Sequence, residues 1–472
     1  MVLNLLSKED VYNIHLTSLD ILQKIGVVIP SEEVLTKLDD AGAQVDFKHQ
    51  RALIPQYLSE EAIRKTPHRF PVYSRDQKTR KFLGGDSVLF TTGSVATDFY
   101  DVELRKYRRL TQQDLANASK VADALENIDI FTCMGSPADV PMQIADRYML
   151  MISLENTKKH VISEAMYKEG ASDAIRMASA IVGGEEELRK KPIITIYLCI
   201  TSPLHYYKPT LDAVVETCRL GLPTMVCSNP MSGATSPVTL AGTLALNMAE
   251  LTSALVITRA INAEAPMLIG TWAKPLDMRE STPVQAGPEP ALLRSCIAQI
   301  ARYHGLPCGG GGLMSVSKTL DVQMGYEEAL TALVPALSGL NLISDMGLIA
   351  VGKALSLEGL VIGDEIAGQI RRILKGIEVN EKTLAFDVME RVGATGCFMK
   401  DRHTLDHFRS ELWMPKITDR TFPEIWVKNG SHDLPVRARE EVKRILKEHQ
   451  VDGLSRETKE VLRTIIKQAA ER

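Results

Sequence analysis

Ile193-Ile194-Thr195-Ile196-Tyr197-Leu198-Cys199 is a short, almost continuously apolar run between the clusters Lys190-Lys191-Pro192 and Thr201-Ser202-Pro203. A run of this length without polar alternation is typical of a strand buried on both faces, as in a parallel sheet. Outward from it in both directions, similar runs end in small or polar clusters and are followed by helical stretches. The eight runs are residues 129–133, 160–163, 193–199, 223–227, 267–270, 306–310, 341–345 and 360–364.

Eight strand–helix units in roughly 250 residues predict a (β/α)8 TIM-type barrel, an α/β fold. An open doubly wound sheet with fewer strands produces a similar pattern and is the alternative. Residues 7–62 have mainly helical periodicity, and residues 70–74 and 87–91 are predicted to be short strands. We therefore predict a small α+β N-terminal region (1–113), the barrel (114–400) and a helical C-terminal extension (401–472).

Composition narrows the class of protein. The chain has 472 residues, 45% of them hydrophobic, and a formal net charge of −4, which provides no general attraction for nucleic acid or an anionic membrane. The first residues resemble no signal peptide, and we expect no run to reach the roughly 18 apolar residues of a membrane span. Seven scattered cysteines fit reduced thiols better than a disulfide framework, so the sequence predicts a cytoplasmic protein.

In such a barrel the reactive groups are expected just beyond the carboxyl ends of the strands. These positions contain no P-loop, no GxGxxG dinucleotide fingerprint, no HExxH and no nucleophile elbow. The run Gly309-Gly310-Gly311-Gly312 has two interpretations. Its backbone amides could cradle a phosphate, or its missing side chains could let a bulky partner or neighbouring backbone approach closely.

Four cysteines, Cys133, Cys199, Cys227 and Cys308, fall at or near predicted strand ends. Thiolates there could bind zinc, but no CxxC or HxC spacing supports a zinc site. Cysteine is also commonly buried, so core packing is the favoured interpretation.

Acidic residues end the last two predicted strands: Asp345, then Asp364 and Glu365. They predict a negative barrel mouth that holds a cationic substrate between carboxylates and aromatic faces such as Trp272 and Tyr100. Helix capping or a structural ion pair is the alternative for Asp364 and Glu365. Further polar candidates near strand ends are Thr271, Asn229 and His205.

Three stretches carry a resemblance to a known family. They are residues 229–242 (NPMSGATSPVTLAG), residues 309–312 (GGGG) with 321–327 (DVQMGYE), and residues 403–411 (HTLDHFRSE). Together they resemble the trimethylamine methyltransferase superfamily of corrinoid-dependent enzymes, and the likeness spans nearly the whole chain.

The resemblance implies a substrate class. Members that contain pyrrolysine demethylate trimethylamine and carry that residue on the inner wall late in the barrel. The corresponding region here, residues 344–347, has only standard residues. The chain therefore resembles the non-pyrrolysine branch, whose substrates are quaternary amines such as glycine betaine, proline betaine, carnitine and γ-butyrobetaine.

The resemblance also implies a methyl acceptor, the cobalt(I) of a corrinoid presented by a cognate partner protein, with no cofactor or metal bound tightly by this chain. We assign catalytic roles to Asp345 and Met346 and expect Gly309 to Gly312 to let the corrinoid approach. The expected substrate-binding residues are Trp272, Thr271, Asn229, Asp364, Glu365, Tyr100 and His205. A substrate carboxylate would need an arginine, a histidine or backbone amides, and the sequence does not rank its candidates His205, Arg279 and Arg294. We also expect a homo-oligomer without a nucleic-acid or membrane partner.

Other functions remain open at this point. A zinc-dependent barrel methyltransferase for an alcohol or thiol is the nearest enzyme. A betaine-binding module without catalysis belongs to a different class, and a phosphate-binding barrel would use the glycine run.

Overall fold

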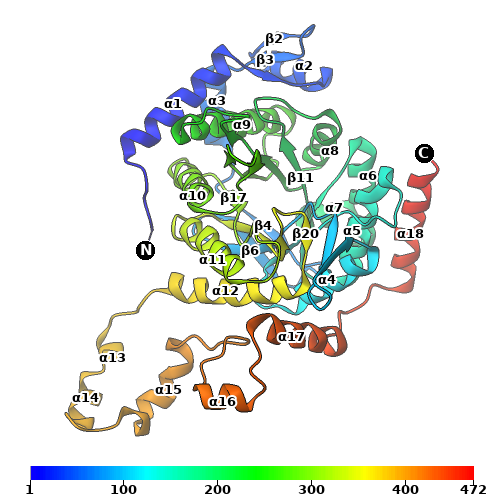
Figure 1. Cartoon of the computed structure of the whole chain (residues 1–472). Helices are drawn as coiled ribbons and strands as arrows, with labels where there is room; N and C mark the ends of the chain where they lie inside the picture. The colour runs from blue at the N-terminus through cyan, green and yellow to red at the C-terminus, as the bar shows by residue number, and fades with distance from the viewer. Residues whose placement is uncertain (1) are drawn as a thin grey trace.

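A closed barrel of eight parallel strands forms the centre of the protein, as seen in a computed structural model that describes residues 2–472 (Figure 1). Around the barrel the order is β10-β11-β12-β14-β17-β18-β6-β9. The strands are β6 (Leu89–Thr92), β9 (Ile130–Thr132), β10 (His160–Glu164), β11 (Ile194–Ile200), β12 (Thr224–Ser228), β14 (Met267–Thr271), β17 (Cys308–Gly311) and β18 (Leu342–Met346). The predicted TIM-type barrel is confirmed, and the open-sheet alternative is wrong.

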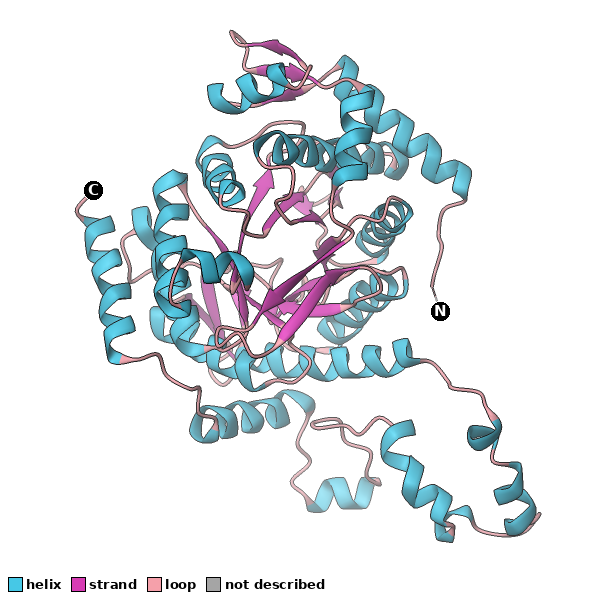
Figure 2. Cartoon of the chain, turned by 180° about the vertical axis from the view of Figure 1, so that it is seen from behind, coloured by secondary structure: helices cyan, strands magenta, loops and turns pink. Residues whose placement is uncertain are grey.

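Each strand is followed by a helix, and these helices form the outer ring of the barrel (Figure 2). They are α4 (Gln112–Ala124), α5 (Ala145–Asn156), α6 (Tyr167–Val182) with α7 (Glu185–Lys190), α8 (Lys208–Arg219), α9 (Leu240–Ile261), α10 (Pro288–Tyr303), α11 (Val322–Leu337) and α12 (Leu357–Lys375). The main hydrophobic core lies between these helices and the outer faces of the strands.

Seven of the eight predicted strands are present, but residues 360–364 are not a strand. They lie inside α12, which begins after the N-cap Ser356, whose hydroxyl accepts from the backbone N–H of Gly359. All five residues are buried because α12 is covered on its outer side by α17 (Leu434–Glu448). A helix covered on both sides has the same apolar run as a buried strand, so periodicity could not separate them.

The eighth strand of the barrel is β6, which pairs with β18 on one side and β9 on the other. The sequence predicted a strand here but placed it in the N-terminal region. The barrel therefore draws its first strand from before residue 114, and α4 is the first helix of its outer ring.

The remaining small sheets close the two ends of the barrel. At the amino end, the hairpin of β4 (Arg69–Tyr73) and β5 (Arg80–Gly84) inserts Phe70, Val72 and Leu83 into the cluster inside the barrel. Two sheets extend the carboxyl end. One contains β13 (Met231–Ser232), β15 (Lys274–Asp277) and β16 (Thr282–Pro283), and the other contains β7 (Asp98–Asp101), β8 (Lys106–Arg109), β19 (Leu348–Ile349) and β20 (Ala354–Leu355).

The N-terminal elements pack over α9. They are α1 (Lys8–Lys24), β1 (Val27–Val28), α2 (Glu32–Asp40), β2 (Gln44–Asp46), β3 (Arg51–Leu53) and α3 (Gln56–Lys65). Helix α1 begins after the N-cap Ser7 with a capping box. Contrary to expectation, α9 is long and apolar enough to cross a membrane, but 83% of its apolar window is buried between the barrel and the N-terminal helices, so it is a core helix here.

The C-terminal extension has two parts. The short helices α13 (Glu381–Leu384), α14 (Phe386–Val392), η2 (Phe398–Lys400), α15 (Arg402–Glu411) and α16 (Pro423–Lys428) form an arm that projects from the barrel (Figure 1). The chain then returns, and α17 packs on α12 and α4 while α18 (Arg456–Ala470) packs on α6 and α5. The short helix η1 (Met142–Ile144) precedes α5.

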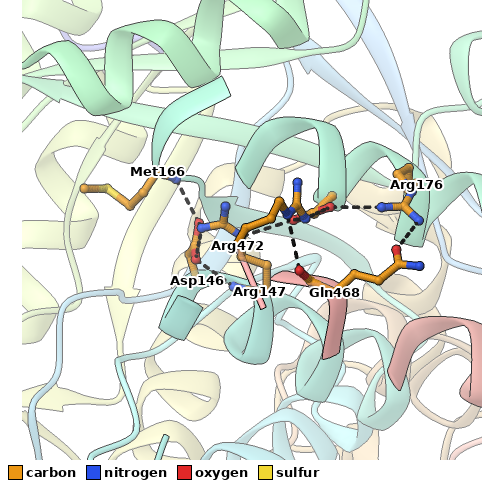
Figure 3. A network of polar contacts seen from close by, with 7 residues as sticks. Asp146, Arg147, Met166, Arg176, Gln468 and Arg472 are labelled. Carbon is orange, nitrogen blue, oxygen red and sulfur yellow. Dashed lines mark hydrogen bonds and ion pairs between the residues drawn. The ribbon is translucent and has the colours of Figure 1, made fainter. Parts of the chain in front are cut away.

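A network of charged side chains holds α18 against α6 (Figure 3). The buried carboxylate of Asp173 accepts from Arg472 at 2.6 Å, from Arg176 at 3.2 Å and from Arg147 at 3.5 Å. Gln468 adds a second link from α18 by accepting from Arg176 at 2.8 Å. The end of the chain is therefore part of the outer wall of the barrel.

Candidate functional site

A cavity opens at the carboxyl end of the barrel, with about 660 Å³ of empty space that includes the solvent at its mouth. Its wall is mostly apolar, with Ile162, Met225 and Leu342 at its base and Trp272 and Tyr197 among its aromatic side chains. Among the ionisable groups in the wall, Asp345 is the carboxylate. The cavity lies where the fold predicts the reactive groups.

Asp345 reaches the cavity through an irregularity in β18. Leu342 and Ser344 line the cavity, so strict alternation would point Asp345 outward and Met346 inward. The pairing of β18 with β6 shifts register between Ile343 and Met346, and Asp345 has a φ of +81°. This left-handed residue turns the Asp345 side chain into the cavity. Strain of this kind is concentrated at functional sites.

The Asp345 carboxylate is almost fully buried, with 3% of the residue exposed. The indole Nε1 of Trp272 donates to both of its oxygens, at 2.9 and 3.2 Å. Burial raises the pKa of Asp345 to about 6, while the nearby positive charge of Arg294 and the Trp272 hydrogen bond act in the opposite direction. The Asp345 carboxyl group is therefore mainly ionised at neutral pH. It places a negative charge that can bind a cation in a mostly apolar wall.

Trp272 contributes aromatic surface next to this carboxylate, and Tyr197 of β11 contributes a second aromatic side chain to the cavity wall. Trp272 follows the end of β14, and its hydrogen bonds to Asp345 fix the position of its ring. The Tyr197 hydroxyl stays protonated because burial and the nearby Glu164 raise its pKa far above the ordinary value. Aromatic faces beside a carboxylate favour a cationic ligand.

Two buried cations lie beside the cavity wall. The sequence offered Arg294 only as one of three unranked candidates for a substrate carboxylate, and it did not identify Lys274 as a site residue. Arg294 of α10 is fully buried, and burial lowers its pKa to about 10. Burial and the charge of Arg294 lower the pKa of Lys274 to about 8. The sequence could not rank Arg294 above His205 and Arg279, because the burial of Arg294 beside the cavity becomes visible only once α10 is placed on the barrel. Arg279 is exposed in the turn between β15 and β16.

Asn229 lines the cavity, as predicted, and its side-chain oxygen accepts a hydrogen bond from Lys274. Thr271 is buried on the outer side of β14. Its hydroxyl donates to Asn247 of α9 at 2.8 Å, so it connects strand to helix. Met346 also faces outward and packs against Gly363 of α12. The structure therefore brings Asp345, Trp272 and Asn229 together at the cavity, but not Thr271 or Met346.

Tyr100 and His205 lie away from the cavity wall. The Tyr100 hydroxyl contacts that of Thr319 at 2.9 Å, and its ring packs against Tyr107 in the sheet of β7 and β8. His205 is exposed in a turn after β11, where its backbone pairs with Thr201. Neither residue belongs to the lining described for residues 2–472.

Asp364 and Glu365 are not at the barrel mouth, because they belong to α12. Asp364 accepts from the backbone N–H of Asn127 at 2.7 Å and pairs with Lys416 at 3.7 Å. Glu365 accepts backbone N–H groups of the returning extension, including that of Thr418 at 2.9 Å. Both carboxylates bind the C-terminal extension. Their role is therefore structural, which was the alternative to substrate binding.

The glycine run belongs to β17, and it makes room inside the barrel. A Cβ on Gly311 would lie 2.7 Å from Asp345 Oδ2 and 2.9 Å from both Arg294 Cζ and Trp272 Cδ1. A Cβ on Gly310 would collide with the Thr271 carbonyl at 2.7 Å. Neighbouring groups therefore approach Gly310 and Gly311 too closely for any side chain, which explains why glycine occupies both positions. Gly309 and Gly312 face Leu342 and Ile343 in the same packed strands.

The strand-end cysteines do not assemble a metal site. Across residues 2–472, no group of three His, Cys, Asp or Glu side chains is placed to hold a metal ion. Cys199 and Cys227 are register partners in β11 and β12 and line the cavity. Cys133 is buried near Ser153, and Cys308 is buried in β17. The zinc alternative therefore has no ligand set among these residues.

Comparison with known proteins identifies close relatives. The profile of the trimethylamine methyltransferase (MTTB) family matches residues 1–472. A trimethylamine methyltransferase of Desulfitobacterium hafniense is 33% identical over 462 residues, covering 98% of this chain and 93% of the relative. A glycine betaine methyltransferase of the same species is 31% identical over 427 residues, covering 90% of this chain and 88% of the relative.

A solved structure has the same architecture. The crystal structure of the hydroxylamine MtmB complex matches with a TM-score of 0.50 and 13% identity, and the match covers 98% of this chain and 93% of that chain. At this identity the likeness bears on the fold, and it agrees with the closed barrel described above.

Proposed function

Because this chain belongs to the trimethylamine methyltransferase family, we propose that it transfers a methyl group from a quaternary amine to the cobalt(I) of a corrinoid held by a cognate protein. The substrate is glycine betaine or a related betaine. The observation that carries the proposal is the buried Asp345 carboxylate, held by Trp272 in the wall of an apolar cavity. A carboxylate beside aromatic faces suits a ligand with a fixed positive charge.

The chemistry requires little of the protein beyond positioning. The nitrogen of a quaternary amine is already cationic, so the bond to its methyl carbon can break with the electron pair leaving on nitrogen. Cobalt(I) supplies the electron pair of the new cobalt–carbon bond and becomes cobalt(III), and a neutral tertiary amine leaves. No proton moves, so no general acid or base is needed. The chain contributes orientation of the ammonium and exclusion of water.

Asp345 and the cavity explain how the methyl group would be presented. The carboxylate lies on the β18 side of the wall, and the cavity opens beyond the carboxyl ends of the strands. An ammonium group held at Asp345 would lie in this cavity, and a methyl group would be reached through the opening. The corrinoid protein would approach from that side, because the β4–β5 hairpin closes the opposite end.

The test mixes the purified full chain with a cobalt(I) corrinoid, protein-bound or free, and follows its visible spectrum. Glycine betaine, proline betaine, carnitine, γ-butyrobetaine and trimethylamine are added separately. We expect conversion to methylcobalt with one or more quaternary amines and no conversion with trimethylamine.

Silence with all five amines, with a corrinoid that a chemical methyl donor does methylate, would contradict the proposal. Tight betaine binding together with that silence would support the alternative of a non-catalytic binding module. Conversion by trimethylamine alone would place the chain with a different substrate class.

A further inference from the structure

Arg294 is a buried guanidinium with vacant donors. It lies on α10 and has 0% exposed surface. Its Nη2 donates to the Gln285 carbonyl at 3.0 Å, whereas its Nε and Nη1 have no hydrogen-bond partner among residues 2–472. A buried charged donor without an acceptor is costly, and such positions are retained where a ligand supplies the acceptor.

This guanidinium lies directly behind the cavity wall. A Cβ atom built on Gly311 would lie 2.9 Å from Arg294 Cζ and 2.7 Å from Asp345 Oδ2, so the two charged groups lie close to each other. In the part of the chain that the structure describes, no hydrogen bond joins the two groups, because Asp345 is bonded to Trp272 instead. Gln285 contacts both regions: its carbonyl binds Arg294, and its side chain lines the cavity with Oε1 unpaired among the described residues.

Lys274 adds a second positive charge. It is 3% exposed, and its Nζ donates to Asn229, whose side chain lines the cavity. The buried charges around this wall are therefore two cations, Arg294 and Lys274, and one carboxylate, Asp345. A substrate that carried only a positive charge would neutralise Asp345 and leave both cations without a counter-charge. A substrate with its own carboxylate would supply one.

We propose that Arg294 and Lys274 form a carboxylate subsite beside Asp345 and Trp272, so that the substrate is a zwitterion with its ammonium at Asp345 and its carboxylate at the two cations. This inference rests on the proposed function and specifies its substrate class. In the complex, the substrate carboxylate accepts from the vacant donors of Arg294, and the Gln285 side chain moves aside.

The short distance between the Asp345 carboxylate and the Arg294 guanidinium narrows the class of zwitterionic substrate further. Because the Asp345 carboxylate and the Arg294 guanidinium approach one point, the two charges of the substrate must also lie close together. A betaine with a single carbon between nitrogen and carboxylate fits this spacing, as in N-methylated α-amino acids. Three intervening carbons, as in γ-butyrobetaine, require a bent chain.

The experiment measures binding by titration calorimetry with the full chain. The ligands are glycine betaine, γ-butyrobetaine and tetramethylammonium, which lacks a carboxylate. We expect the wild-type chain to bind glycine betaine more tightly than the other two. The change Arg294→Gln should weaken glycine betaine binding by about 30-fold or more, the loss typical of one buried charge pair. Tetramethylammonium binding should not weaken when it is measured at about pH 8, where Asp345 stays ionised without the Arg294 charge that lowers its pKa.

Arg302→Gln is the matched control, because Arg302 lies on the same helix but binds the Ser338 carbonyl and Asn4, away from the cavity. It should leave all three affinities unchanged. An equal loss for glycine betaine and tetramethylammonium in Arg294→Gln would overturn the subsite while the proposed function stands. Failure of the wild-type chain to bind any of the three would instead count against the proposed function.

Circular dichroism checks that each variant is folded. If Arg294→Gln does not fold, Lys274→Gln replaces it in the same comparison, with the same expected loss for the zwitterion alone. Equal affinity of the wild-type chain for glycine betaine and tetramethylammonium would overturn the subsite without any variant.

Discussion

Asp345 shows how one backbone angle decides which residue enters the site. The sequence identified both Asp345 and Met346 as catalytic candidates, and alternation along the strand favours Met346 as the inward residue. The left-handed φ of +81° at Asp345 reverses that order. Aspartate adopts this conformation more readily than most residues, so Asp345 is compatible with its own irregular backbone.

Replacing Asp345 by Asn should remove the acceptor for the ammonium group while keeping the shape of the side chain. We expect quaternary amine binding to weaken by about 2–5 kcal/mol, the range for one desolvated charge pair. Titration calorimetry with glycine betaine measures the loss. Asp277→Asn is the control, since Asp277 is a half-buried carboxylate of β15 that lies outside the cavity lining described for residues 2–472. Unchanged affinity in Asp345→Asn would remove Asp345 from the site.

The pH dependence of binding should follow the ionisation of Asp345. Burial raises its pKa to about 6, so the carboxylate becomes protonated, and neutral, as the pH falls through that value. Glycine betaine affinity should be level between about pH 7 and the Lys274 pKa of about 8, fall above that pKa as Lys274 loses its charge, and fall by about tenfold per unit below about pH 5. The affinity begins to fall at the pKa of the free protein, about 6, and levels off at the lower pKa of the complex, because bound amine stabilises the ionised carboxylate. The acid-side inflection should be absent in Asp345→Asn, and its persistence there would assign it to another group.

Gly311→Ala tests the close approach around the site. The new methyl group would lie under 3 Å from Asp345, Arg294 and Trp272, so at least one of them must move. We expect a loss of about 1–3 kcal/mol in the free energy of unfolding, as for overpacked cores, together with weakened amine binding. Urea unfolding and calorimetry measure the two effects.

Gly325→Ala on α11 is the matched control for that change. Nothing lies within 4 Å of a Cβ at this position, so the substitution should be neutral or stabilise the helix by up to about 1 kcal/mol. Similar behaviour of the two alanine variants would show that Gly311 has no special packing role.

Among the elements, α12 shows why a hydrophobic pattern alone cannot separate a fully buried helix from a buried strand. Its residues Leu360 to Asp364 are all buried, because α12 lies between the barrel and α17. With no exposed side in that segment, the helical period disappears and the run is indistinguishable from a strand. The roles of Asp364 and Glu365 changed with it, from substrate binding to holding the returning extension.

The attachment of α18 should depend on Asp173. Asp173→Asn removes the charge that Arg472, Arg176 and Arg147 share, and Arg147 is itself only 6% exposed (Figure 3). We expect a loss of about 1.5–3 kcal/mol in the free energy of unfolding, typical of hydrogen bonds to charged groups. Limited proteolysis should also cut near α18 faster than in the wild-type chain.

Asp212→Asn provides the comparison, because Asp212 pairs with Lys208 at 2.7 Å in a solvent-accessible position on α8. That change should cost less than about 1 kcal/mol. Equal losses in the two variants would mean that burial of the Asp173 network contributes nothing extra.

At the scale of the whole molecule, the projecting arm carries more large apolar side chains than it buries. Large apolar side chains on it are exposed, including Ile377 (83%), Phe386 (73%), Met399 (86%) and Phe422 (76%). Patches of this kind in a folded chain mark a surface that contacts another protein. We expect the arm to pack against a second copy of this chain, in line with the homo-oligomer predicted from the sequence.

Sedimentation of the full chain tests this expectation. The wild type should sediment as an oligomer, and a chain with Phe386→Asp and Phe422→Asp should shift to smaller species. Phe47→Asp, an exposed aromatic residue near β2, is the control and should leave the mass unchanged. A wild-type monomer would contradict the expectation and leave the arm as a surface for the corrinoid protein.

The sequence by itself determined the barrel, seven of its eight strands and the family, because buried parallel strands and motif runs are local signals. It also singled out Asp345, Trp272 and Asn229, which follow strand ends and so meet at the same end of the barrel. The tertiary structure alone decided the rest. Closure assigned β6 as the missing strand, packing made α12 a helix, and the bulge in β18 turned Asp345 inward. Only the tertiary structure ranked Arg294 above the other carboxylate-binding candidates and added Lys274, by placing two positive charges beside one carboxylate. The energy of a charge depends on its neighbours in space and not along the chain.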